Sequence, residues 1–257
     1  MNWFITGDCH GQTFRLTNFA KGKKQDTAII ILGDAGFNTN HKKMNNRAKN
    51  ILEKSNIFYY LVRGNHEERP ENLPNIETIY DEEVQNEVYI EPNYPHIRYF
   101  KDGFTYIING YSTLVLGGAY SVDKKIQIAR GGWFESEQLT EKEKTFIYTK
   151  VKGQDFDFIL SHTCPISIEP TDLFLSCVTQ SEVDKSMEYW LEEVKNNCNW
   201  KIWCFGHFHA DRLERPRMEM FYTDISPIEE IYERWKEKED EVELDWWLEK
   251  SPQYYWD

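Results

Sequence analysis

The chain has 257 residues, of which 40% are hydrophobic and 28% are charged, a composition typical of a globular protein. Its net charge of −13 argues against a protein that coats nucleic acid through a broad basic face, although bound divalent cations can create a small positive site. The sequence has no apolar run of membrane-spanning length, no secretory leader and no CxxC pair among its five cysteines. We therefore expect a cytoplasmic protein without a membrane span or a disulfide framework.

The first third of the chain alternates between short apolar segments and longer polar ones. The segment 27–32 (TAIIIL) is β-branched and followed by a glycine, which is typical of a buried strand. We expect strands at 2–6, 27–32 and 57–62, and helices at 13–20 and 43–55. This alternation predicts a mainly parallel sheet with functional loops at the carboxyl ends of its strands.

The middle of the chain has short strand-like segments at close spacing, separated by Pro, Asn, Asp and Gly. This pattern predicts hairpins of a second sheet. The segments are 87–90, 97–100, 104–108 and 111–116. Further along, the patterns predict helices at 140–152 and 182–197, strands at 156–160 and 201–205, and a hairpin within 213–222. Thr140, followed by Glu143, fits a capping box.

We expect residues 1–225 to form one domain and residues 226–257 to form an acidic, aromatic C-terminal segment. From residue 228 onward this segment contains 11 acidic and 4 basic residues. Its apolar residues have near-helical spacing, at Ile228, Ile231, Trp235, Val242 and Trp246. The spacing favours a helix that packs on the domain, and a helix that binds a partner or a second copy is the alternative.

Five of the expected strands end in short turns that combine Gly or Ser with side chains able to bind a metal ion. The turns are Gly7–Gly11, Gly33–Asp34, Gly64–Glu67, Ser161–His162 and Gly206–His209. They contain five of the seven histidines of the chain. Because strand ends in an α/β sheet converge on one crevice, we expect these side chains to meet there.

The spacing inside two of these turns predicts pairs of polar side chains on one side of the chain. Residues i and i+2 of an extended segment point the same way, so Asp8 and His10 face one centre while Cys9 points into the core. His207 and His209 follow the same rule, with the residue between them turned towards the core. The flanking glycines permit close backbone approach.

The turns together supply a set of candidate metal ligands with oxygen and nitrogen donors and no thiolate. The candidates are Asp8, His10, Asp34, Asn65, His162, His207 and His209. Such donors suit Mn, Fe or Zn better than Ca or a structural zinc. The set is too large for one tetrahedral ion, and with a bridging carboxylate it suits two ions about 3.5–4 Å apart.

The order of these motifs, DxH, GD, GNHE, H and GHxH, resembles that of the calcineurin-like metallophosphoesterases, over roughly residues 3–222. The resemblance implies a four-layer α/β/β/α sandwich with two central mixed sheets flanked by helices. It implies that one ion is held by Asp8, His10, Asp34 and His209. It implies that the second ion is held by Asp34, Asn65, His162 and His207, and that His66 is the acid–base residue.

The implied activity is hydrolysis of a phosphate ester, with a small or nucleotide-derived substrate as the first choice. Two divalent ions would lower the pKa of a shared water, so that a hydroxide attacks phosphorus. Manganese is the first choice, with Fe, Zn and Ni as alternatives. His66 would donate a proton to the departing oxygen, and Asn65 would also contact the phosphoryl group.

The second motif departs from the GDxVDRG pattern of the protein Ser/Thr phosphatase branch. It lacks the second Asp, which would orient His66, and the Arg that clamps phosphate. Arg63 and Arg130 are therefore the candidate substrate-binding cations, and a solvated surface role is the alternative for Arg130. The alternative functions are an RNA or DNA phosphodiesterase, then a protein Ser/Thr phosphatase, or a non-catalytic scaffold. The oligomeric state stays open.

Overall fold

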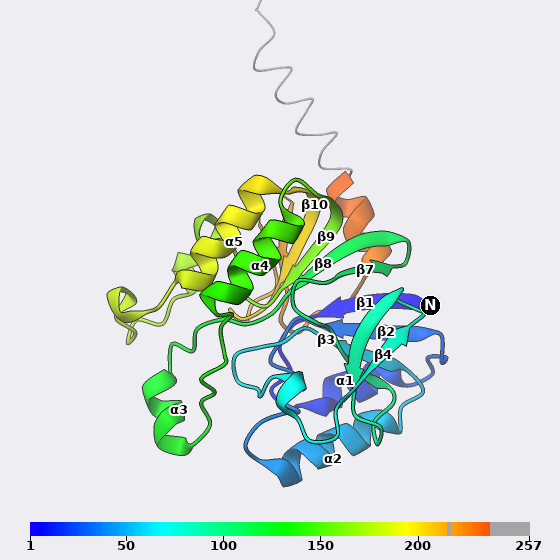
Figure 1. The fold of residues 1–257 in the computed structure, drawn as a ribbon. Coiled ribbons are helices and arrows are strands. Elements are labelled where there is room, and N and C mark those ends of the chain that lie inside the picture. The colour runs from blue at the N-terminus through cyan, green and yellow to red at the C-terminus, as the bar shows by residue number, and fades with distance from the viewer. Residues whose placement is uncertain (215–216, 237–257) are drawn as a thin grey trace, which may run out of the picture.

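The computed structural model describes residues 1–214 and 217–236. Within this part of the chain, the strands form two mixed sheets that pack face to face, and helices cover their outer faces (Figure 1). Helices α1 (Thr13–Ala20) and α2 (Lys42–Glu53) cover the first sheet, and α4 (Glu141–Val151) and α5 (Ser186–Asn197) cover the second. The four-layer α/β/β/α prediction is confirmed.

The first sheet contains the expected βαβ units at its centre. Its strand order is β13-β1-β2-β3-β6-β5-β4. The strands are β1 (Asn2–Thr6), β2 (Thr27–Ile31), β3 (Phe58–Leu61), β4 (Glu77–Asp81), β5 (Asn86–Ile90), β6 (Ile97–Tyr99) and β13 (Ser226–Pro227). Strands β1, β2, β3 and β6 run parallel, so the carboxyl ends of β1, β2 and β3 lie at one edge.

The second sheet has the order β11-β12-β10-β9-β8-β7. Its strands are β7 (Thr105–Ile108), β8 (Tyr111–Leu116), β9 (Asp155–Ser161), β10 (Asn199–Phe205), β11 (Arg212–Glu214) and β12 (Met218–Met220). Strands β8, β9 and β10 are parallel. A short, largely exposed helix, α3 (Lys124–Arg130), follows β8. The short 3-10 turns are η1 (Pro70–Asn72), η2 (Ile166–Ile168), η3 (Thr171–Leu173) and η4 (Gln180–Glu182).

The prediction that all four middle segments belong to the second sheet is wrong. Strands β5 and β6 extend the first sheet, and only β7 and β8 join the second. The sequence also missed β4, which pairs antiparallel with β5. Local hydrophobic patterning identifies a strand, but the choice of partner depends on contacts between distant segments.

The helix expected to begin at residue 182 begins instead at Ser186. Residues 180–182 form η4, and Asp184 Oδ1 accepts a hydrogen bond from the backbone N–H of Ser186. This carboxylate satisfies one of the free N–H groups at the start of α5, so the helix begins there. The capping box of α4 is confirmed, because Glu143 N–H donates to Thr140 Oγ1 and Thr140 N–H donates to Glu143 Oε2.

Strand alternation builds the core. On β2, Ile30 faces the second sheet, whereas Ile29 and Ile31 face the helices that cover the first sheet. The space between the sheets is filled by side chains such as Trp3, Tyr106 and Phe158. Burial of each large apolar side chain contributes about 1.5–3 kcal/mol, so this double-sided burial favours an interior position for β2 in its sheet.

The C-terminal part of the described chain packs on the two sheets. Ser226–Pro227 pairs antiparallel with β1, and residues 228–236 are helical. Ile228, Ile231 and Trp235 are buried in the core between the sheets. Val242 and Trp246 lie outside the described residues. In the described ranges, we find no helix with both the length and the apolarity needed to cross a lipid bilayer.

Candidate active site

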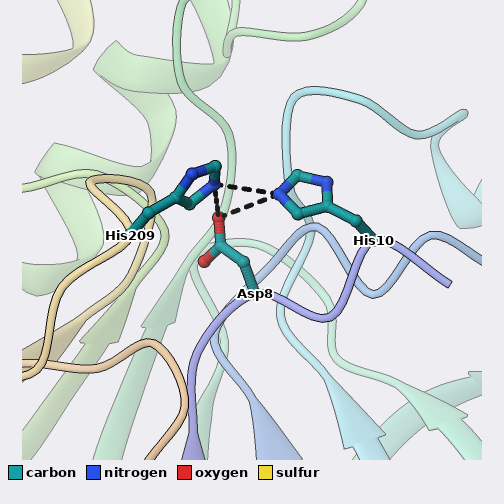
Figure 2. Close-up of side chains that lie close together, drawn as sticks. All are labelled: Asp8, His10 and His209. Carbon is teal, nitrogen blue, oxygen red and sulfur yellow. Dashed lines mark hydrogen bonds and ion pairs between the residues drawn. The ribbon is translucent and has the colours of Figure 1, made fainter. Parts of the chain in front are cut away.

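Asp8 follows β1 and is approached by two histidines (Figure 2). The Nε2 atoms of His209 and His10 lie 3.2 and 3.7 Å from Asp8 Oδ2, and 2.9 Å from each other. Asp8 is buried, and among the described residues none makes a well-aligned hydrogen bond to Oδ2. A buried carboxylate oxygen with two imidazole nitrogens beside it and no well-aligned hydrogen bond from the described part of the chain suits a divalent cation between these three side chains.

Asp34 follows β2 and is the centre of a second group. Its Oδ2 atom lies 3.7 Å from His162 Nε2 and 3.9 Å from His66 Nε2. Its Oδ1 atom accepts a hydrogen bond of 2.9 Å from the backbone N–H of His66. Donor atoms of Asp8, Asp34 and His162 also lie within 4.8 Å of one another, so the two groups adjoin.

His207 lies between the two groups. Its backbone N–H donates to Asp8 Oδ1 at 3.0 Å, and its ring centroid is 5.0 Å from that of His162. The seven candidate ligands therefore lie close together at the ends of β1, β2, β3, β9 and β10.

The hydrogen bonds of His162 leave its Nε2 atom available as a ligand. Its Nδ1 atom lies 2.7 Å from the carbonyl oxygen of Leu32, which can only accept, so Nδ1 carries the proton. In the neutral form of the ring, Nε2 is then the nitrogen with a free lone pair, and it lies 2.8 Å from Asn65 Oδ1. Binding of a cation by His162 would therefore use Nε2.

Two buried residues fix the orientation of the Asn65 amide. Ser121 Oγ donates to the Glu137 carboxylate, and it accepts a hydrogen bond of 2.8 Å from Asn65 Nδ2. This relay turns Asn65 Oδ1 towards His162. Neither supporting residue could be identified from local patterns, since Ser121 lies in the glycine-rich segment after β8 and Glu137 belongs to no motif.

The backbone of the site is strained at four ligand positions. The φ angles of His10, Asp34, His207 and His209 are 46°, 45°, 69° and 54°. This left-handed conformation costs about 1–2 kcal/mol per residue and is concentrated at functional sites. The extended backbone expected for these turns is therefore wrong. Tight turns, and not extended chain, bring the two side chains of each pair to one side. Cys9 is buried in the core, as expected.

The close approach of the chain to Asp34 explains why the GNHE motif begins with a glycine, Gly64. A Cβ atom on Gly64 would overlap Asp34 Oδ1. The glycine therefore lets the turn after β3 pass against the Asp34 carboxylate, and the His66 backbone N–H can then donate to it.

The first turn is tied to the C-terminal part of the chain. The Arg15 guanidinium donates to the carbonyl oxygens of Gly7, Asp8 and Tyr222. Thr6 Oγ1 donates to the carbonyl oxygen of Asp224 at 2.6 Å. These bonds hold the Asp8 turn from both sides, and no local pattern around Arg15 indicates this role.

The electrostatics favour the forms of most candidate ligands that can bind a metal ion. Burial lowers the pKa of His10 and lowers the pKa of His207 to about 3, so both are neutral at pH 7. Burial opposes ionisation of Asp34, but the neighbouring histidines outweigh it and lower the pKa of Asp34. The adjacent Asp8 carboxylate raises the pKa of His209. Neutral imidazoles and ionised carboxylates are the forms that bind metals.

Glu67 does not orient His66. Its Oε1 atom accepts hydrogen bonds from the backbone N–H groups of Gly36 and Phe37. Burial raises the pKa of Glu67 to about 7. Glu67 therefore supports the loop that carries Asp34, and His66 itself is partly exposed to the cavity described below.

The structure does not bring Arg63 or Arg130 to the metal-binding side chains. The Arg63 guanidinium is buried and donates to Asp102 Oδ2 at 2.8 Å and to the carbonyl oxygens of Gly117, Ser136 and Glu137. These hydrogen bonds occupy the N–H donors of the Arg63 guanidinium. They join loops of the two sheets. Arg130 is exposed at the end of α3. Neither side chain lines the cavity beside the site.

A cavity of about 350 Å³ opens beside the ligands. Its wall includes Asp34, Asn65, His66, His207 and His209 on one side. The other side comes largely from the segment between β9 and α5 and from the segment after β8. The sequence analysis did not identify this wall, because its apolar residues have neither helical nor strand periodicity.

Glu188, which lines this cavity, predicts a pH-dependent stability. Burial raises its pKa to about 7, so the folded protein keeps a proton that the unfolded chain loses near pH 4.5. Stability should therefore fall as pH rises from about 4.5 to 7. Glu188→Gln should remove a penalty on the order of 2–3 kcal/mol at pH 8.

Urea unfolding at pH 5 and pH 8 measures this effect, with the exposed Glu193→Gln on the same helix as control. The difference in unfolding free energy between Glu188→Gln and the unsubstituted protein should grow towards pH 8. Equal pH dependence in both proteins would contradict the assignment.

Comparison with known proteins identifies the family of the chain. A sequence profile of the calcineurin-like phosphoesterases matches residues 1–211. The solved structure of a phosphopantetheinyl hydrolase from Mycobacterium tuberculosis is similar at 12% identity and a TM-score of 0.43, over 86% of this chain and 90% of that one. No curated protein matches the sequence. The chain therefore belongs to the calcineurin-like phosphoesterase family and is a metal-dependent phosphoric ester hydrolase.

Proposed function

We propose that this protein hydrolyses a small or nucleotide-derived phosphate ester with two divalent metal ions. The observation that carries the proposal is the pair of adjoining ligand groups around Asp8 and Asp34, both buried and both approached by imidazole nitrogens. Two adjoining groups of hard and borderline donors suit two ions rather than one.

The proposed ligand assignment follows the two groups. Asp8, His10, Asp34 and His209 hold one ion, and Asp34, Asn65, His162 and His207 hold the other. Manganese is the first choice, since the donors are carboxylate, amide and imidazole. When bound, such ions supply an activated water and offset the charge that develops on the phosphoryl group.

His66 is the proposed proton donor to the leaving oxygen. It lines the cavity, and its Nε2 atom is 3.9 Å from Asp34 Oδ2, so it stands beside the metal ligands. Its backbone N–H holds Asp34 while its imidazole stays partly exposed, which supports a role in proton transfer to a bound ester. Asn65, whose Nδ2 donates to Ser121, is proposed to contact the phosphoryl group as well.

The net charge and the missing GDxVDRG motif favour a small substrate over nucleic acid or a phosphoprotein. We also propose a cytoplasmic location, supported by five cysteines that are all free thiols.

Hydrolysis of p-nitrophenyl phosphate and of its bis-ester tests the proposal. Purified protein stripped of metal by a chelator should be inactive, and added manganese should restore turnover. The ratio of the two rates assigns monoester or diester preference. A manganese-loaded protein that hydrolyses neither compound would favour the scaffold alternative.

A further inference from the structure

The cavity beside the metal ligands is placed to receive the alcohol part of a phosphate ester. The cavity is shared between the metal-binding side chains and His66, the proposed proton donor. A phosphoryl group at the metal centre would have its leaving oxygen near His66. The group attached to that oxygen would then extend into the cavity.

The far wall of this cavity is apolar. The apolar side chains are Tyr120, Val122, Leu173, Phe174, Leu175, Val178, Val183 and Phe208. The rings of Phe174 and Phe208 stack with their centroids 6.4 Å apart. Leu175 is 60% exposed and Val122 is 42% exposed. Large apolar side chains gathered at the rim of one cavity mark a site that an apolar group covers.

The carboxyl groups of the far wall make it acidic rather than basic. They are Asp123, Glu169 and Glu188. Asp123 Oδ1 and Glu188 Oε2 are buried without a hydrogen bond in the described part of the chain. The Glu169 carboxylate pairs with Lys185 at 2.6 Å. Within the described ranges, the cavity wall contains no Lys or Arg. Lys185 is already paired with Glu169 and does not line the cavity, so a second phosphate would meet the Asp123 carboxylate and no unpaired cation among the described residues of the wall.

We propose that the cavity selects phosphoesters whose alcohol part is apolar and carries no second phosphate, and that Phe174, Leu175 and Phe208 bind this part. The proposal rests on the proposed phosphoesterase function, because it takes the metal centre as the phosphate site. It narrows the substrate class, since nucleoside di- and triphosphates would place further phosphates against the acidic wall.

Binding of non-hydrolysable phosphonates to the manganese-loaded protein tests the selectivity. Methylphosphonate, hexylphosphonate and hexane-1,6-bisphosphonate share one head group and differ in the tail. We expect hexylphosphonate to bind at least about tenfold more tightly than methylphosphonate in isothermal titration calorimetry, because its chain is buried. The bisphosphonate should bind more weakly than hexylphosphonate.

A positive charge introduced at the rim of the cavity should shift the preference from hexylphosphonate towards the bisphosphonate. Leu175→Lys places a cation opposite the distal phosphonate and should shift the bisphosphonate-to-hexylphosphonate affinity ratio by about tenfold towards the bisphosphonate. Tyr80→Lys is the matched control, because Tyr80 is 58% exposed on β4 and does not line the cavity. It adds the same charge and should leave the ratio unchanged.

Equal affinity for the methyl and hexyl compounds, binding of none of them, or equal shifts in the two lysine variants would overturn the inference. Hydrolysis of p-nitrophenyl phosphate is measured on the same samples. Selective phosphonate binding without turnover would contradict the proposed function and leave the cavity preference standing. Turnover without tail selectivity would contradict the cavity preference alone.

Discussion

Replacing Asp34 by Asn should lower kcat/KM for p-nitrophenyl phosphate by about 10³-fold or more, because the proposed bridging carboxylate loses its charge. The amide keeps the shape of the side chain, and its oxygen can still accept the hydrogen bond from the His66 backbone N–H. We therefore expect the variant to fold. Manganese bound per chain, measured by mass spectrometry of dialysed protein, should fall from about two to about one.

Asp157→Asn is the control for this experiment. Asp157 lies on β9 and pairs with Lys201 at 2.7 Å, away from the metal ligands. It should leave both metal content and turnover close to those of the unsubstituted protein. An Asp34→Asn protein with unchanged turnover would count against the two-ion assignment, and loss of folded protein would be detected separately by circular dichroism.

Replacing His66 by Ala should lower kcat by about 10²–10⁴-fold while both metal ions stay bound, since the proposed role is proton donation rather than metal binding. The loss should be larger for phenyl phosphate than for p-nitrophenyl phosphate, because p-nitrophenolate leaves without help from an acid. Steady-state kinetics with the two substrates and metal analysis of the same samples measure the effect.

His96→Ala is a matched control for this variant. The two imidazoles have similar exposure, 27% for His66 and 30% for His96, but His96 pairs with Glu53 and does not line the cavity. If His66→Ala lost metal, His66 would be a ligand. If the loss were equal for the two substrates, His66 would not act as the acid.

The position of the site could be predicted from the sequence, and the reason is topological. Each candidate ligand directly follows a strand, and parallel strands bring their carboxyl ends to one edge, so Asp8, Asp34 and Asn65 had to converge if β1, β2 and β3 formed one sheet. The local geometry was less accessible. A spacing of two residues suggested extended chain, whereas His10 and His209 adopt left-handed backbone conformations.

Contacts made by distant residues could not be predicted. Arg63 stands beside the GNHE motif in sequence, but its acceptors come from Asp102, Gly117 and the loop before α4. The Asn65 amide is fixed by Glu137, more than seventy positions away along the chain, through Ser121. The predicted sheet for β5 and β6 was wrong for the same reason, because alternation along a strand does not indicate which strand lies beside it.

The anchoring of the Asp8 turn has a consequence for synthesis. Arg15 and Thr6 donate hydrogen bonds to the carbonyl oxygens of Tyr222 and Asp224. The backbone N–H of His207 donates to the Asp8 carboxylate. A chain that leaves the ribosome N-terminus first has made its first ligand turn long before these partners exist. Contacts between such distant segments form late in folding. Catalytic competence therefore arises only after residues 207–224 have been synthesised, when most strands of both sheets already exist.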